Sequence, residues 1–347
     1  MTLSRYVRLA PASCPTGSVT WLAMSRRGIG VGVAVLLGLL VSSCGVEPLT
    51  ETLVEEIEFE SVSFPGAWLQ PFMPPLEEGE AVTVGGKLRI PATDEPVPLV
   101  VIAHGCGGVS GAALGWARDL EAFGIASLVL DSFEGRSIRR VCSGSEGVNQ
   151  ASLLVDLFRA VEALESHDYI DGSNVAVMGL SMGGRTALWS AQERFQDQYD
   201  GRPLAAYVAF YPLGCYIQLE NETEVNGGPI RIFHGEEDNW LPISQCETYV
   251  DRMATGGVDI DLYAYPNAHH GFDDRGLTEA FPVIGALSPR KCVVVEKNGV
   301  LTETSAGGPV TAANSCVERG ATIAYNAEAR EQAAADLVAF LNSTFDE

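Results

Sequence analysis

Basic residues are scarce in this sequence. Lys and Arg number 22 against 45 Asp and Glu in 347 residues, so the formal net charge is −23 with histidine neutral. Proteins that bind nucleic acids or anionic lipid surfaces present clusters of Lys and Arg to the phosphates. The charge therefore argues against a nucleic-acid-binding protein and against electrostatic docking to a membrane.

The N-terminal part lacks an apolar run long enough for a transmembrane helix. The apolar residues 29–41 fall short of the roughly 20 that a spanning helix needs. They follow the basic stretch Met24-Ser-Arg-Arg-Gly28 and end at Val41-Ser-Ser-Cys44. This arrangement resembles a bacterial lipoprotein signal, in which the Cys is lipidated after cleavage. An ordinary signal peptide with an incidental Cys is the alternative.

The lipoprotein interpretation makes several predictions about the N-terminus. Residues 1–43 would be a signal peptide, with Met24 as an alternative start, and Cys44 would carry lipid. The protein would be anchored in the bacterial cell envelope through this lipid only. Gly45 after the Cys is similar to the pattern for outer-membrane delivery. The acidic residues that follow predict a tether over residues 44–63.

Pairs of cysteines at zinc-binding spacing are also missing. No C-x2-C or C-x3-C pair occurs, which disfavours a structural zinc site. Neither a metal nor another cofactor is implied. Of the eight cysteines, Cys14 lies in the predicted signal region and Cys44 is the predicted lipid site. The six that remain would form disulfides in an exported protein; they are Cys106, Cys142, Cys215, Cys246, Cys292 and Cys316.

Residues 64–347 are long enough for one large domain, and 46% of the whole sequence is hydrophobic. Short apolar runs alternate with segments at helical spacing, which predicts a doubly wound, mostly parallel sheet with helices on both faces. The expected strands are 98–103, 126–130, 175–178, 204–211, 229–234 and 260–265, and the expected helices are 112–123, 151–164, 243–254 and 327–341. Gly85-Gly86 suggests a hairpin turn within residues 81–90. Residues 273–325 form a long insertion, read either as a lid-like segment beside the site or as a distant surface excursion.

The clearest motif is Gly179-Leu-Ser-Met-Gly183. An apolar strand precedes it and residues that fit a helix follow it. Strand, sharp turn and helix are the setting of a nucleophile elbow, which lifts the Ser181 hydroxyl clear of the sheet. Gly179 and Gly183 lack a Cβ, so the strand and the helix can pass close to each other.

A serine nucleophile needs a base, and the base needs a carboxylate. In α/β-hydrolases these follow the serine in the order acid, then histidine. Two downstream strand ends fit this order. The first leads into His234-Gly-Glu-Glu-Asp238, and the second leads into Tyr265-Pro-Asn-Ala-His-His-Gly-Phe272. Glu236, Glu237 and Asp238 compete as the acid, and His269 and His270 compete as the base.

Taken in order, these pieces resemble the dienelactone hydrolase family of α/β-hydrolases, together with His104-Gly105 and Asp131-Ser-Phe133. The resemblance spans roughly residues 81–341. It implies that Asp238 is the acid and that His270, directly before Gly-Phe, is the base. The backbone N–H groups of Met182 and Cys106 would form the oxyanion hole. His104 and His234, at strand ends beside glycine, are expected to be structural.

The founding members of that family carry Cys at the elbow, whereas this chain has Ser181. The departure favours a general serine hydrolase that cleaves a carboxylic ester or lactone through an acyl-enzyme. Two alternatives remain: a peptidase resembling the prolyl oligopeptidase group, which shares the triad order, and a non-catalytic binding lipoprotein.

Three disulfide pairs are predicted. Cys106–Cys142 would tie the oxyanion loop to the loop after Asp131. Cys215–Cys246 would join the ends of neighbouring strands near the acid, and Cys292–Cys316 would staple the insertion.

Overall fold

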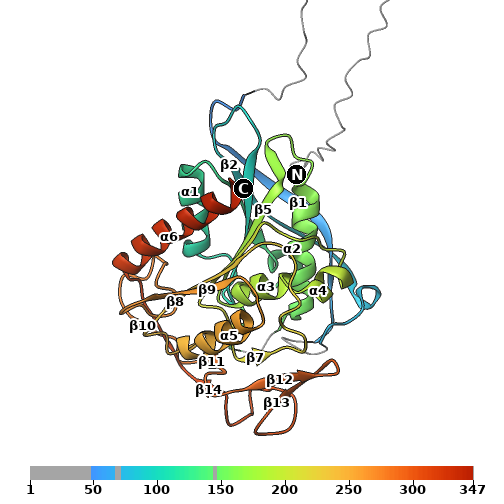
Figure 1. The fold of residues 1–347 in the computed structure, drawn as a ribbon, viewed down its shortest axis with the longest axis vertical. Helices are drawn as coiled ribbons and strands as arrows, with labels where there is room; N and C mark the ends of the chain where they lie inside the picture. Colours follow the sequence, from blue (N-terminus) through green and yellow to red (C-terminus); the bar gives the residue numbers. More distant parts are fainter. Residues whose placement is uncertain (1–47, 67–71, 144–146, 347) are drawn as a thin grey trace, which may run out of the picture. The chain divides into compact units, whose positions relative to one another are not determined.

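An eight-stranded sheet forms the centre of the computed structural model, which describes residues 48–66, 72–143 and 147–346 (Figure 1). The predicted signal peptide and the predicted lipidation site at Cys44 lie outside the described residues. The described residues form one compact unit. None of the helices in the described ranges combines the length and the apolar character needed to cross a membrane.

The sheet has the strand order β1-β2-β4-β3-β5-β6-β8-β9. These strands are β1 (Leu53–Ser63), β2 (Glu80–Ile90), β3 (Val97–Ala103), β4 (Ala126–Asp131), β5 (Ile170–Leu180), β6 (Ala206–Phe210), β8 (Ile230–Gly235) and β9 (Ile260–Tyr265). β1 and β2 are antiparallel to their neighbours, and every pairing from β4 to β9 is parallel. The prediction of a doubly wound, mostly parallel sheet is therefore confirmed.

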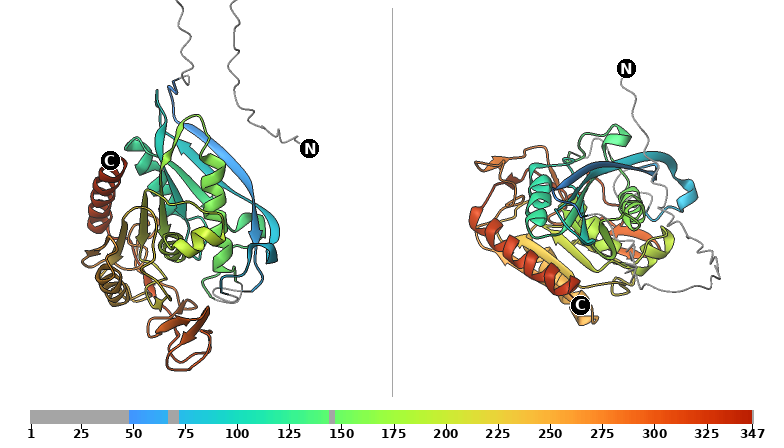
Figure 2. Two further views of the ribbon diagram at one scale, coloured as in Figure 1. Left: turned by 45° about the vertical axis from the view of Figure 1, so that its right-hand side comes forward. Right: turned by 90° about the horizontal axis from the view of Figure 1, so that it is seen from above.

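Helices cover both faces of this sheet (Figure 2). They are α1 (Gly111–Ala122), α2 (Gln150–Leu164), α3 (Met182–Ser190), α4 (Glu193–Gln198), α5 (Ile243–Thr255) and α6 (Ala327–Phe345), with 3-10 turns η1 (Leu76–Glu78) and η2 (Glu134–Arg136). Side chains alternate along a strand, so one strand serves two cores. Leu99 and Val101 of β3 pack with α2, α3 and α5, while Val100 and Ile102 pack with α1 and α6.

The prediction of a tether over residues 44–63 is wrong from residue 53 onward. β1 pairs with β2 along its whole length, from Leu53 opposite Ile90 to Ser63 opposite Glu80. Its acids alternate with apolar residues: Glu56 and Glu58 are exposed, whereas Ile57 packs against the core. Because side chains alternate between the two faces of a strand, the acidic face concealed an apolar one.

The glycine pair expected to turn a hairpin lies inside β2. A Cβ on Gly85 would be 2.3 Å from the carbonyl oxygen of Ile57, and a Cβ on Gly86 would be 2.5 Å from that of Val129. The two glycines therefore let β1 and β4 approach β2 closely, and the chain does not reverse there.

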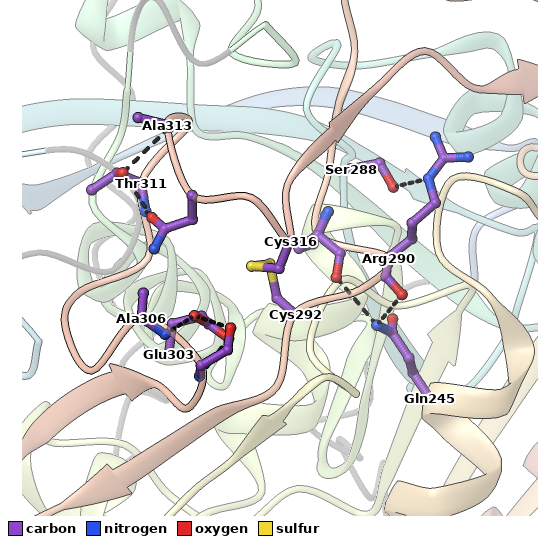
Figure 3. Close-up of a disulfide and its surroundings, with 12 residues drawn as sticks. Gln245, Ser288, Arg290, Cys292, Glu303, Ala306, Thr311, Ala313 and Cys316 are labelled. Atoms are coloured by element: carbon purple, nitrogen blue, oxygen red, sulfur yellow. Dashed lines mark hydrogen bonds between the residues drawn. A yellow bond between two sulfur atoms is a disulfide. The ribbon is translucent and has the colours of Figure 1, made fainter.

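The insertion forms small sheets next to the main one. β10 (Phe281–Pro282) pairs with β15 (Thr322–Ile323), β11 (Leu287–Ser288) with β14 (Glu318–Arg319), and β12 (Val294–Lys297) with both β13 (Val300–Glu303) and β7 (Ile217–Gln218). The disulfide Cys292–Cys316 ties this segment together (Figure 3). Gln245 of α5 fastens it to the domain, because its Nε2 donates to the carbonyl oxygens of Pro289 and Arg290 at 3.2 and 3.3 Å.

The structure contains the three cysteine pairs that were predicted. Cys106–Cys142, Cys215–Cys246 and Cys292–Cys316 have Cα–Cα distances of 5.0, 4.9 and 4.8 Å. The first disulfide joins the loop after β3 to the loop after η2, next to Ser181. In the described part of the chain, no cysteine is left as a free thiol.

Candidate active site

Ser181 lies in the sharp turn between β5 and α3. Its backbone has φ +55° and ψ −108°, a conformation that is strained for a residue with a side chain. The turn is held by the Ser181 N–H, which donates to the Phe210 carbonyl at 2.9 Å. A Cβ on Gly179 would lie 1.9 Å from the carbonyl oxygen of Gly183, and one on Gly183 would lie 2.1 Å from that of Ala103. The two glycines are thus required for strand and helix to pass, as the motif predicted.

Three side chains from three strand ends meet at this turn. Ser181 follows β5, Asp238 lies in the turn after β8, and His270 lies in the loop after β9. His270 Nε2 is 3.0 Å from Ser181 Oγ, and His270 Nδ1 is 2.8 Å from Asp238 Oδ2. The carboxyl ends of parallel strands share one edge of a sheet, which is why residues so distant in sequence come together.

The second oxygen of Asp238 is held by the backbone. Its Oδ1 accepts the N–H groups of Trp240 and Leu241 at 2.8 and 2.9 Å. Burial raises the pKa of this carboxyl, but the charge and hydrogen bond of His270 and the Leu241 N–H outweigh burial, so the pKa is lowered. Asp238 is therefore an ionised, fixed acceptor for the His270 ring.

The competing residues lie elsewhere. Glu236 and Glu237 are exposed, and His269 places its Nδ1 2.9 Å from the Glu237 carbonyl oxygen. His104 and His234 are buried, and burial lowers the pKa of both despite nearby acids. Both are thus neutral side chains packed inside the fold, in agreement with the structural role expected for them.

Two cavities border Ser181 and share Cys106, Cys142 and Trp240 as walls. The larger, about 210 Å³, is an open cleft that includes His270 and Tyr211. The smaller, about 30 Å³, has walls from Met182, Arg185 and mostly apolar residues. The remaining walls of the smaller cavity are Cys106, Val141, Cys142, Val148, Leu213, Trp240, Leu241 and Leu287.

Comparison with known proteins fits this geometry. The sequence profile of the dienelactone hydrolase family matches residues 84–345. The chain belongs to this family. Among curated relatives, a Bradyrhizobium protein described as a probable 2-oxo-3-(5-oxofuran-2-ylidene)propanoate lactonase is 21% identical over 220 residues, 58% of this chain and 83% of its own length. An uncharacterised Bacillus subtilis peptidase is 27% identical over 146 residues, 35% of this chain and 22% of its own.

Solved structures show the same fold. A protein described as a dienelactone hydrolase from Klebsiella pneumoniae aligns with TM-score 0.51 and 16% identity, over 83% of this chain and 99% of its own. A dienelactone hydrolase-like promiscuous phosphotriesterase from metagenomic libraries aligns with TM-score 0.50 and 19% identity, over 83% of this chain and 98% of its own. This dienelactone hydrolase family member is thus a hydrolase with the α/β-hydrolase fold.

In this family member, a second carboxylate supports the wall beside His270. Tyr211 packs its ring 4.5 Å from that of His270 and donates its hydroxyl to Asp273 Oδ1 at 2.6 Å. Trp116 Nε1 donates to Asp273 Oδ2 at 2.7 Å. Burial raises the pKa of Asp273, although these two donors and the charge of Arg330 oppose the rise. Sequence reasoning missed Tyr211 and Asp273, because neither belongs to a motif and only the fold brings them together.

The predicted oxyanion donors border the smaller cavity of this dienelactone hydrolase family member. Met182 is the first residue of α3, so its N–H has no carbonyl partner within the helix. Cys106 lies in the loop after β3. The Cys106–Cys142 disulfide holds this loop, as does the Val141 N–H, which donates a hydrogen bond to the Cys106 carbonyl oxygen. No group of three or more potential metal ligands occurs among the His, Cys, Asp and Glu residues that the structure describes.

Proposed function

We propose that this member of the dienelactone hydrolase family is a serine hydrolase that cleaves a carboxylic ester or lactone. Ser181 is the nucleophile, His270 the general base and Asp238 the acid that orients it. The observation that carries the proposal is the unbroken path of hydrogen bonds from Ser181 Oγ through both nitrogens of His270 to Asp238. A serine hydroxyl becomes an effective nucleophile only in such an arrangement.

Each group has one task in the reaction. Ser181 Oγ attacks the carbonyl carbon while its proton moves to His270 Nε2. The N–H groups of Met182 and Cys106 stabilise the negative oxygen that forms. The C–O bond of the ester then breaks, and the alcohol leaves with the proton from His270. Water next attacks the acyl-enzyme and gives a proton to His270, which returns it to Ser181 as the carboxylic acid departs.

Two relatives bear on the substrate class. The Bradyrhizobium relative is described as a lactonase, which supports an ester or lactone for this chain. The Bacillus subtilis relative is described as a peptidase, and this chain covers 22% of its length, so a peptide remains the second candidate substrate. A non-catalytic binding lipoprotein is a weaker candidate, because the described chain keeps a nucleophile, base and acid in contact.

The test combines covalent labelling with turnover. A fluorophosphonate probe should label the purified protein, and phenyl acetate should be hydrolysed faster than peptide substrates. Ser181→Ala should abolish labelling and lower kcat by several powers of ten, because the triad acts as a unit. Ser173→Ala, at the exposed far end of β5, is the matched control and should leave both unchanged. Near-normal turnover by Ser181→Ala would refute the proposal.

We also propose that the protein is a lipid-anchored component of the bacterial cell envelope. The support is the sequence Val41-Ser-Ser-Cys44 behind an apolar run, together with paired cysteines, which are typical of exported proteins. Cys44→Ser should move the protein from the detergent phase to the aqueous phase on partitioning. Retention of the variant in the detergent phase would contradict the anchor.

A further inference from the structure

The two cavities beside Ser181 face different portions of an ester if the proposed function holds. In ester cleavage the base passes its proton to the departing alcohol oxygen. His270 is a wall of the open cleft and is not among the walls of the smaller cavity. Met182 and Cys106, the predicted oxyanion donors, both border the smaller cavity. This arrangement directs the alcohol portion into the open cleft and the acyl portion into the smaller cavity.

The sizes of the two cavities differ in the same sense. The smaller cavity has a volume of about 30 Å³, and one water-sized probe occupies roughly 10–15 Å³, so it holds an acyl group of only a few heavy atoms. The open cleft has a volume of about 210 Å³. The site therefore fits a short acyl group joined to a larger alcohol.

The insertion supplies an apolar part of the cleft wall. Leu277, Val283 and Ile323 line the cleft, and each is only half-buried, so apolar surface is left for a substrate. This wall is fastened beside the proposed base. The Ala324 N–H donates to the His270 carbonyl oxygen at 3.3 Å, and Ile323 forms a β-bridge with His270. The insertion thus places apolar side chains next to the residue that protonates the alcohol.

The polar side chains of the cleft outside the triad are largely engaged elsewhere. Ser110 Oγ accepts a backbone N–H of α1 at 3.3 Å, and Asp274 Oδ1 accepts a backbone N–H of its own turn at 2.9 Å. The Tyr211 hydroxyl donates to Asp273. Arg140 is exposed, so its charge lies in water. An alcohol with many hydroxyl groups would give up hydrogen bonds to water in this cleft and regain few of them.

We propose that the open cleft binds an apolar alcohol portion and that Leu277, Val283 and Ile323 of the insertion determine this specificity. The preferred substrate is an ester of a short carboxylic acid with a longer apolar alcohol. A small lactone fits less well, because its ring joins the acyl and alcohol portions and they cannot separate into two cavities. The inference rests on the proposed ester hydrolysis and adds the substrate class.

Two isomeric esters test the assignment of the cavities in the wild-type protein. Hexyl acetate and ethyl hexanoate have the same atoms and the same ester group, but the long chain lies on the alcohol side in the first and on the acyl side in the second. We expect kcat/KM to be at least tenfold higher for hexyl acetate. If ethyl hexanoate is cleaved as well or better, this inference is overturned.

A second pair of esters tests the apolar character of the cleft. Pentyl acetate and glycerol 1-acetate have the same acyl group and alcohol portions with the same number of heavy atoms. We expect kcat/KM to be at least tenfold higher for pentyl acetate, since burial of each CH2 group should contribute a factor of about two or more. Equal or better cleavage of glycerol 1-acetate would contradict an apolar alcohol site.

Variants then assign the preference to the insertion. Leu277→Asn/Val283→Thr keeps the side chains near their size but makes them polar, and should lower the hexyl-to-ethyl acetate ratio of kcat/KM about tenfold. Ethyl acetate itself should change no more than about twofold, because its ethyl group buries little apolar surface. Val300→Thr is the matched control: Val300 is 60% exposed on β13 and lines neither cavity, so the ratio should stay unchanged.

The outcomes separate this inference from the proposed function. A wild-type hexyl-to-ethyl ratio in Leu277→Asn/Val283→Thr would contradict the role of the insertion. If this double variant does not fold, the single variant Val283→Thr and the two pairs of esters decide. Turnover of phenyl acetate with labelling of Ser181 upholds the proposed function even where the specificity fails. Absence of both in the wild type would overturn the proposed function and this inference with it.

Discussion

The sheet and the insertion meet at Ser181 but are built in different ways. β5, β8 and β9 are parallel strands of the main sheet with 11, 6 and 6 residues, and the three proposed catalytic side chains follow their ends. The insertion has strands of two to four residues, a disulfide and exposed apolar side chains such as Phe281 and Ile284. Nevertheless, Leu287 and Ile323 of the insertion line the two cavities beside the serine.

The difference separates two requirements of a hydrolase. The reacting groups are fixed by strands and by the strained turn at Ser181, which the surrounding contacts hold in place. The walls that meet the substrate come partly from a segment with few strand hydrogen bonds of its own. Loops carried by a rigid scaffold tolerate change better than the scaffold does, so specificity can vary while the chemistry is kept.

The largest effect on kcat is expected for replacement of His270, the proposed base, which follows strand β9 of the sheet. His270→Ala should lower kcat by several powers of ten, as Ser181→Ala should, and the double variant should fall little further. His269→Ala should change kcat only a few-fold, because that ring points to the Glu237 carbonyl. Steady-state kinetics on the four variants checks this. The reverse ranking of the two histidine variants would move the base by one position.

The scaffold should be more sensitive than the surface to loss of an ion pair. Asp156 is fully buried and binds Arg136 at 2.7 Å and the Ser61 hydroxyl of β1 at 2.5 Å. Asp156→Asn should lower the free energy of unfolding by about 3–5 kcal/mol, because it leaves a buried guanidinium unpaired. Glu162→Gln, which breaks the exposed pair with Arg159, should cost at most about 1 kcal/mol. Urea unfolding measures both, and equal costs would remove the distinction.

Removal of the insertion's disulfide should affect stability and substrate binding more than chemistry. The double variant Cys292→Ala/Cys316→Ala removes a disulfide between residues that are 24 positions apart in the sequence. From chain entropy we expect the free energy of unfolding to fall by roughly 3–4 kcal/mol. We expect KM to rise a few-fold with kcat largely kept, since Leu287 and Ile323 are wall residues. A fall in kcat comparable to that of His270→Ala would show that the insertion also positions the reacting groups.

The smallest effect is expected for Asp273→Asn, a change where the sheet and the insertion join, and it concerns the pH dependence of stability. Its folded pKa is raised by burial above the unfolded value of about 3.9. The wild type should therefore lose stability as pH rises from about 4 through that folded pKa. The Asp273→Asn variant has no titratable group at this position, so it should not lose stability in this way. In urea unfolding, the stability of the wild type relative to the variant should thus fall as the pH rises above about 4. A constant difference would refute the pKa shift.

The contrast between the sheet and the insertion also explains which features could be predicted from the sequence. The elbow and the parallel strands were predictable because local patterns specify them: an apolar run, two glycines and a serine. The predicted cysteine pairs also agree with those in the structure. Each joins two cysteines that lie close in the sequence, beside an expected strand end or within the insertion. The residue pattern alone left Asp238 and His270 competing with their neighbours, the family resemblance favoured these two, and the geometry of the structure agrees with that choice.

Other features depend on packing that no local pattern encodes. The apolar side of β1 was concealed because Glu56, Glu58 and Glu60 alternate with it. A Gly-Gly pair such as Gly85-Gly86 is also typical of a hairpin turn. Here the glycines are needed for another reason, because carbonyl oxygens of β1 and β4 lie too close to them for a Cβ. Arg185 belongs to none of the motifs in the sequence. Its burial without an anionic partner is visible only once α2, α3 and the loop after β6 are in place.

The position of β1 has a practical consequence for recombinant production. A shortened protein that began at residue 64, where the sequence suggested the domain starts, would leave one edge of β2 without a partner strand. Open strand edges recruit other chains and promote aggregation. The shortening would also remove the Ser61 hydroxyl and the Val62 carbonyl that help to bind Asp156 and Arg136. Soluble material should therefore be sought from a chain that starts at or before residue 48.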